Sequence, residues 1–152
     1  MKTRTLWGAV ALAVLSINAL AAEGEAAGTI KTSKGEVSIE RAGARIPGEV
    51  GTAVQVADKV RTGPDGAVGL TLRDNTLLSA GPNSLLTLDK FSFDSTTNAG
   101  TLSVGVRKGT LAVATGKIAR QTPESIDFRT ATSVIGVRGT EFVIEAGSGN
   151  ED

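Results

Sequence analysis

Apolar and polar residues alternate along most of the chain after residue 28, and this alternation limits what the chain can fold into. A period of two residues places every second side chain on one side of an extended strand, so each such stretch predicts a half-buried strand. Helical periodicity is nearly absent from the same region, and the sequence therefore predicts an all-β fold. The apolar positions that carry the pattern are Val37 and Ile39, Val54 and Val56, Val68, Leu70 and Leu72, Leu102, Val104 and Val106, Leu111 and Val113, and Ile126 and Phe128.

Four clusters of turn-forming residues interrupt the predicted strands. They are Gly-Pro-Asp-Gly at 63–66, Asp-Asn at 74–75, Gly-Pro-Asn at 81–83 and Ser-Thr-Thr-Asn at 95–98. Glycine and asparagine accept positive φ angles, and short polar side chains hydrogen-bond to their own backbone. We expect the chain to reverse direction at each cluster.

Gly-Thr pairs precede several strand-like segments, at 28–29, 51–52, 100–101, 109–110 and 139–140. Their unequal spacing argues against a repeat of fixed period. Many short strands separated by glycine corners fit a β-solenoid-like single domain or a compact β-sandwich, and the pattern does not separate these two architectures.

The N-terminus predicts a cleavable secretory signal peptide over residues 1–21. Lys2 and Arg4 precede an uncharged run of about 15 residues, which ends in small residues. Because a transmembrane helix needs about 20 apolar residues, we interpret the run as a signal and not as an anchor. We expect cleavage after Ala21, with Ala22 as the next choice. The mature protein is then expected in the periplasm, or alternatively at the cell surface or in the medium.

Composition narrows the classes of function. The chain has 16 basic and 16 acidic residues, and removal of Lys2 and Arg4 leaves 14 against 16, a net charge of −2, which disfavours nucleic-acid binding. The absence of Cys excludes disulfides, thiolate metal sites and lipid attachment. About 130 mature residues suffice for one domain, which we place at 28–146, with a flexible tail at 147–152.

The absence of His and Cys also removes the commonest nucleophiles, bases and metal ligands. Only carboxylates remain, and a glycosidase-like pair is the one enzymatic route left open. We expect no enzymatic activity and no cofactor. Asp65, Asp74 and the stretch from Asp89 to Asp94 lie near predicted turns, but none shows calcium-loop spacing, so we assign them to turn formation and not to a metal.

The alternation changes phase in the last strong segment. Ile135 and Val137 share one parity, whereas Phe142 and Ile144 have the other. Gly139 lies between the two pairs, and we predict a strand bend there.

Two charged residues flank this predicted bend. We expect Arg138 and Glu141 to pair with each other or to satisfy backbone carbonyls at the corner. The alternative is that Arg138 offers its planar donors to a carboxylate of a partner.

The segment from Thr130 to Phe142 resembles the hallmark of the FecR domain. Segments 58–63, 68–74, 81–84 and 106–109 are similar to the family pattern in the same order, and the resemblance covers about residues 28 to 145. The most specific part is Gly136, Val137, Arg138, Gly139, Thr140, Glu141 and Phe142. The resemblance implies a β-solenoid-like domain and a role in signalling. The best-known members relay the occupancy of an outer-membrane transporter to a cytoplasmic sigma factor.

Those members carry a sigma-binding region and a membrane helix before the domain, and a transporter-facing domain after it. Here a predicted signal peptide precedes the domain, so we expect a free-standing exported interaction or scaffold module with no membrane span after cleavage. Its expected partner is an unknown envelope protein or a second copy, bound at an exposed strand edge near Phe142 to Glu145. The alternative function is a self-assembling structural component of the cell envelope.

Overall fold

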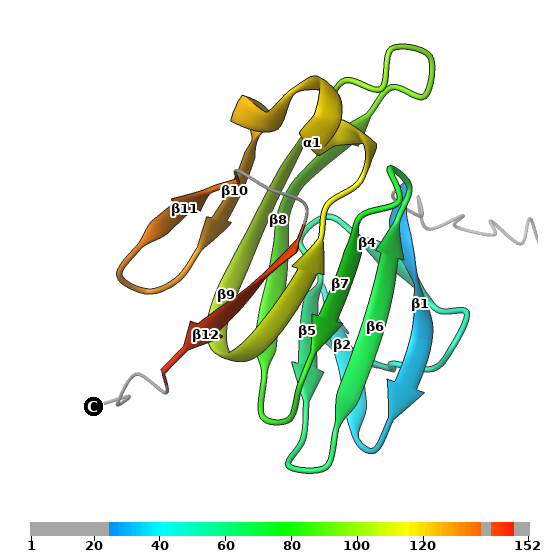
Figure 1. Cartoon of the computed structure of the whole chain (residues 1–152). Helices are drawn as coiled ribbons and strands as arrows, with labels where there is room; N and C mark the ends of the chain where they lie inside the picture. The colour runs from blue at the N-terminus through cyan, green and yellow to red at the C-terminus, as the bar shows by residue number, and fades with distance from the viewer. Residues whose placement is uncertain (1–24, 138–140, 148–152) are drawn as a thin grey trace, which may run out of the picture.

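The computed structural model describes residues 25–137 and 141–147 (Figure 1). Most of these residues lie in strands, with one short helix among them, and the prediction of an all-β fold is confirmed. The strands are β1 (Ala26–Lys34), β2 (Val37–Arg41), β3 (Ala44–Pro47), β4 (Ala53–Gln55), β5 (Lys59–Thr62), β6 (Ala67–Leu72), β7 (Leu77–Ala80), β8 (Leu85–Phe93), β9 (Gly100–Ala114), β10 (Ile126–Arg129), β11 (Val134–Gly136) and β12 (Glu141–Ala146). The helical elements are α1 (Lys117–Gln121) and the 3₁₀ turn η1 (Pro123–Ser125).

The strands form one curled, open sheet that resembles half of a barrel (Figure 1). Its main path runs β3-β2-β5-β8-β9-β7-β6-β1-β4, with β10 and β12 added beside β9 and β11 beside β10. Among the described strands every pairing is antiparallel except that of β9 with β10. The curled sheet confirms neither the solenoid nor the sandwich.

The long strand β9 belongs to two wings of this sheet. Its first part pairs with β8 and β10, whereas its last six residues pair with β7 and β12. We call β3, β2, β5, β8, the first part of β9, β10 and β11 the β2 wing. We call β4, β1, β6, β7, the last part of β9 and β12 the β6 wing.

The corner between the wings lies at Gly109. This residue has a φ angle of +88°, and a Cβ built on it would lie 2.5 Å from the Cα of Ser84. Only glycine takes this angle without strain. The expectation that Gly109 introduces a strand is therefore wrong, because it sits inside β9, where the strand passes from one wing to the other. The bend predicted at Gly139 lies outside the described residues.

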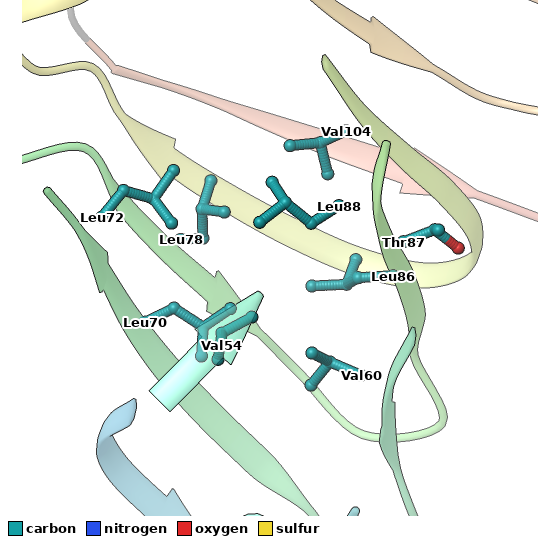
Figure 2. A pocket seen from close by; sticks show the side chains of 9 residues that line it. All are labelled: Val54, Val60, Leu70, Leu72, Leu78, Leu86, Thr87, Leu88 and Val104. Atoms are coloured by element: carbon teal, nitrogen blue, oxygen red, sulfur yellow. The ribbon is translucent and has the colours of Figure 1, made fainter. Parts of the chain in front are cut away.

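The core fills the space between the inner faces of the two wings. Figure 2 shows Leu70, Leu72 and Leu78 of the β6 wing converging on Leu86 and Leu88 of the β2 wing. The apolar gap that remains among them has a volume of about 10 Å³, which is room for no more than a single water molecule. This centre is therefore packing and not a ligand site.

The alternation predicted most of these inward positions correctly. Val68, Leu70 and Leu72 are all buried on β6. Val56 is the exception, since its side chain is 43% exposed. The strand β4 ends at Gln55, and Ala57 turns the chain with a φ angle of +73°, so Val56 is already in the turn.

An ion pair links the second strand of the main path to the strand at its other end. Arg41 of β2 donates two hydrogen bonds to the buried Asp58, at 2.9 and 2.7 Å, and a third to the backbone oxygen of Ala53 in β4. The Gln55 backbone N–H also donates to Asp58. The pair thus links β2 of one wing to β4 of the other.

The predicted reversals are confirmed. Asn75, Asn83 and Asn98 have φ angles of +68°, +53° and +60°, so asparagine supplies the left-handed residue in three of the four clusters. The helix α1 was not predicted, because five residues are too few to show a helical period. Asp74, which lies far away in the sequence, accepts hydrogen bonds from the first two N–H groups of α1. Its backbone oxygen accepts from Lys117 N–H and its carboxylate from Ile118 N–H.

Candidate interaction surface

The described residues of the predicted signature lie on both wings. Gly136 ends β11, which pairs with β10, whereas Glu141 and Phe142 begin β12, which pairs with β9. Val137 is buried, and the ring of Phe142 meets that of Phe128 edge-on, with centroids 5.2 Å apart. These contacts make Val137 and Phe142 part of the packing between the wings. Arg138, Gly139 and Thr140 lie outside the described residues, and so does the proposed pairing of Arg138 with Glu141.

The strand edge predicted near Phe142 to Glu145 exists. Among the described residues, β12 pairs only with β9, so its other backbone edge carries no strand. Glu141 and Glu145 are exposed along it. The strand β11 is likewise paired on one side only among the described strands, and its residue Val134 is 65% exposed.

Asp74 and Asp94 act in turns as predicted, whereas the assignment of Asp89 to a turn is wrong, because this residue lies inside β8. Both carboxylate oxygens of the buried Asp74 accept hydrogen bonds from Thr76, through its backbone N–H and its hydroxyl. Asp94 accepts from the backbone N–H groups of Thr96 and Thr97. In the described part of the chain no three acidic residues are grouped as metal ligands would be.

One carboxyl group has a shifted pKa. The hydrogen bond from the Ser103 hydroxyl, and then the hydrogen bond and charge of Arg129, lower the pKa of Asp127, while partial burial opposes them. Ser103 lies between Lys90 and Asp127 on the neighbouring strands. Because its hydroxyl is buried and donates to a carboxylate, we assign this group to structure and not to catalysis.

The outer face of the β2 wing is charged. Its outward positions alternate with buried ones, as Figure 2 shows for Thr87, which points away from Leu86 and Leu88. The side chains of ten charged residues lie on this face. They are Glu40, Arg45, Lys59, Arg61, Asp89, Lys90, Arg107, Lys108, Asp127 and Arg129, and we call this surface the charged face.

The outer face of the β6 wing lacks charge on its three central strands. Leu77 and Val143 are 47% and 63% exposed there, among small or hydroxylated neighbours. The outward residues are Ala67, Gly69 and Thr71 of β6, Leu77 and Ser79 of β7, Thr110, Ala112 and Ala114 of β9, and Val143 of β12. We call these nine residues the uncharged face.

Charged residues of the described strands lie at the two borders of the uncharged face. On one side β12 carries the exposed Glu141 and Glu145. On the other side β1 carries the exposed Lys31 and Lys34, and Lys34 pairs directly with Ala67 of β6. The face therefore has an acidic border and a basic border.

Sequence reasoning missed the uncharged face. Its signal was present, because the positions between the predicted inward residues at 67–72 and 110–114 carry no charge. The strand pairing was needed to show that β6, β7 and β9 are neighbours.

Fold and surface together define a small β module whose two outer sheet faces differ in charge. The sequence matches the FecR protein family over residues 58–151, and the chain belongs to this family. The match begins at the buried Asp58 and includes β5 to β12. No curated protein and no solved structure matches the chain. None of the described helical segments has the length and apolar character to cross a membrane.

Proposed function

We propose that this FecR-family protein is a non-enzymatic interaction module of envelope signalling, exported to the periplasm, and that it binds its partner through the uncharged face. Membership of a family of signalling regulators supports the role in signalling. The uncharged face supports the site, and it is the observation that carries the proposal.

A sheet face that meets water usually presents polar and charged side chains opposite its buried side. The charged face of this protein follows that rule, with Lys59 and Arg61 on the central strand β5. The uncharged face departs from it on three adjacent strands and leaves Leu77 and Val143 exposed. Exposed apolar surface of this kind marks binding sites in soluble proteins.

Site-specific photocrosslinking in intact cells tests the site. A photoreactive amino acid at Ser79, on the uncharged face, should give a discrete adduct with an envelope protein. The same photoreactive amino acid in place of Arg61, on the charged face, is the matched control, since both positions are exposed on central strands. Equal labelling from both positions, or none from Ser79, would contradict the proposed site.

The export step rests on the N-terminal sequence. The mature protein should begin at Ala22, and deletion of residues 2–21 should keep the protein in the cytoplasm. Cell fractionation with intact-mass measurement of the periplasmic protein checks both outcomes. A full-length N-terminus on the periplasmic protein would contradict cleavage.

A self-assembling component of the envelope is the second candidate function. The open edges of β11 and β12 favour it, because an unpaired edge can add a strand from another chain. Repeated addition, or end-to-end stacking of solenoid-like units, would produce long assemblies. The apparent particle mass measured by light scattering should then keep rising with protein concentration. A particle mass that stays constant would exclude this function.

A further inference from the structure

We propose that the uncharged face takes a second copy of this chain, packed face to face about a twofold axis that runs parallel to the strands. The inference rests on the proposed function, in which the uncharged face is the interface, and it goes further by naming the occupant and its orientation. Its support is the arrangement of charge at the two borders of the face.

The two borders are joined by a single cross-strand row. Glu145 of β12 pairs with Thr110 of β9, whose backbone oxygen accepts from the N–H of Gly81, the residue that follows β7. On the far side Lys34 of β1 pairs with Ala67 of β6, one position before the paired Val68 and Ala80. Glu145 and Lys34 therefore lie at the same height along the strands, at opposite ends of one row.

This arrangement selects one of the two simple twofold axes. An axis parallel to the strands reverses the strand order but keeps the height, so Glu145 of one copy meets Lys34 of the other, twice. An axis perpendicular to the strands, within the plane of the interface, sets each β12 against the other β12 and brings Glu141 and Glu145 close to like charges. Opposite charges that face each other favour the first arrangement, and like charges oppose the second.

The centre of the face fits self-association. β7 is the third of the five strands from β12 to β1, so Leu77 and Ser79 lie near the proposed axis and meet their own copies. Around them Gly69, Ala112 and Ala114 have little or no side chain, which lets two sheets approach closely. The exposed Leu77 would then be covered by its counterpart.

The size of the face predicts a weak dimer. Five strands spaced about 4.8 Å apart and about 20 Å long give roughly 480 Å² per copy. Two such faces bury roughly 960 Å², below the roughly 1,200 Å² of stable interfaces, so we expect a transient dimer. The measurements must reach high protein concentration.

Sedimentation velocity of the purified exported protein, at concentrations up to about 1 mM, tests the dimer. We expect a monomer-dimer equilibrium that stops at two copies. Exposed charge pairs are worth little, so Glu145→Lys and Lys34→Glu should each raise the dissociation constant by about two- to fivefold. The double variant Glu145→Lys/Lys34→Glu should restore it, because each new charge faces the other across the interface.

Two single-cysteine variants supply an independent readout, since the chain has no Cys of its own. Ser79→Cys should link two copies with a short bis-maleimide, whereas Arg61→Cys on the charged face should not. Three results would overturn the dimer. They are a purely monomeric protein, a series of species larger than two copies, and a double variant that dimerises more weakly than both single variants. If the protein is monomeric while Ser79 photocrosslinks to a different protein, the dimer fails and the proposed function stands. If the protein is monomeric and Ser79 gives no photocrosslink, both the dimer and the proposed function are wrong.

Discussion

The charged face and the uncharged face belong to the same curled sheet and share the strand β9, yet their outward residues differ in kind. On the β2 wing, outward positions of β5 and β10 hold long charged side chains such as Lys59, Arg61 and Arg129. On the β6 wing, the equivalent positions of β6 and β7 hold Gly69 and Ser79. The strands of both wings pair through the same backbone hydrogen bonds, which do not depend on the outward side chains. The fold itself therefore does not require the difference. The proposed function accounts for the difference, because in it the charged face meets water and the uncharged face meets a protein surface.

The largest expected effect comes from the corner that separates the two faces. Gly109→Ala should lower the free energy of unfolding by about 3 kcal/mol or more, because the new Cβ adds a clash with Ser84 to the strain of a positive φ angle. Urea denaturation followed by circular dichroism measures this loss.

Gly43→Ala is the matched control for Gly109→Ala. Gly43 has a φ angle of +80°, but a Cβ there meets nothing within 4 Å, so this variant carries only the backbone strain of about 1 to 2 kcal/mol. Equal losses in the two variants would show that the corner tolerates a side chain and that the wings are less closely fixed than the structure indicates.

The next effect concerns association and not stability. Ser79→Lys places a cation in the middle of the uncharged face and should reduce crosslinking to a partner, or dimerisation, by about tenfold or more, because an unpaired charge is desolvated in the interface. Its free energy of unfolding should change by less than about 0.5 kcal/mol, since Ser79 is exposed.

Arg61→Ser is the reverse change, made on the charged face. Arg61 is as exposed as Ser79, and its loss should alter neither association nor stability by a measurable amount. A tenfold loss of binding from Arg61→Ser, with no effect from Ser79→Lys, would assign the interface to the charged face.

The inward residues of both wings could be predicted from the sequence, because alternation is a local pattern that each strand carries by itself. Val68, Leu70 and Leu72 are examples, and the turns at Asn75 and Asn83 are equally local. The order of the strands could not be predicted, because it depends on contacts between distant segments. For the same reason the role of Gly109 and the neighbourhood of β6, β7 and β9 appeared only in the structure.

A smaller effect is expected from pH on the charged face. The hydrogen bond from Ser103 and the neighbouring Arg129 lower the pKa of Asp127 in the folded state, so the carboxylate stabilises the fold above the unfolded pKa of about 4 and loses this effect as the pH falls through the folded value. Asp127→Asn should therefore destabilise the protein at pH 7, by less than about 1 kcal/mol because the group is partly exposed.

Urea denaturation at neutral and at strongly acidic pH measures the Asp127→Asn effect. The difference between wild type and variant should shrink on acidification. A difference that grows at low pH would mean that Asp127 is held protonated in the fold, contrary to its hydrogen bond from Ser103.

The smallest effect is expected at Gly136, although this residue belongs to the most specific part of the family pattern. It lies at the end of β11 opposite Asp127, its φ angle is not positive, and a Cβ there meets nothing within 4 Å. Gly136→Ala should therefore change the free energy of unfolding by less than about 0.5 kcal/mol, which thermal and urea denaturation can check. If the variant keeps its stability but loses crosslinking to a partner, the open space beside Gly136 is where another backbone approaches. The binding surface would then lie on the β10 and β11 hairpin, and the contrast between the two sheet faces would no longer identify it.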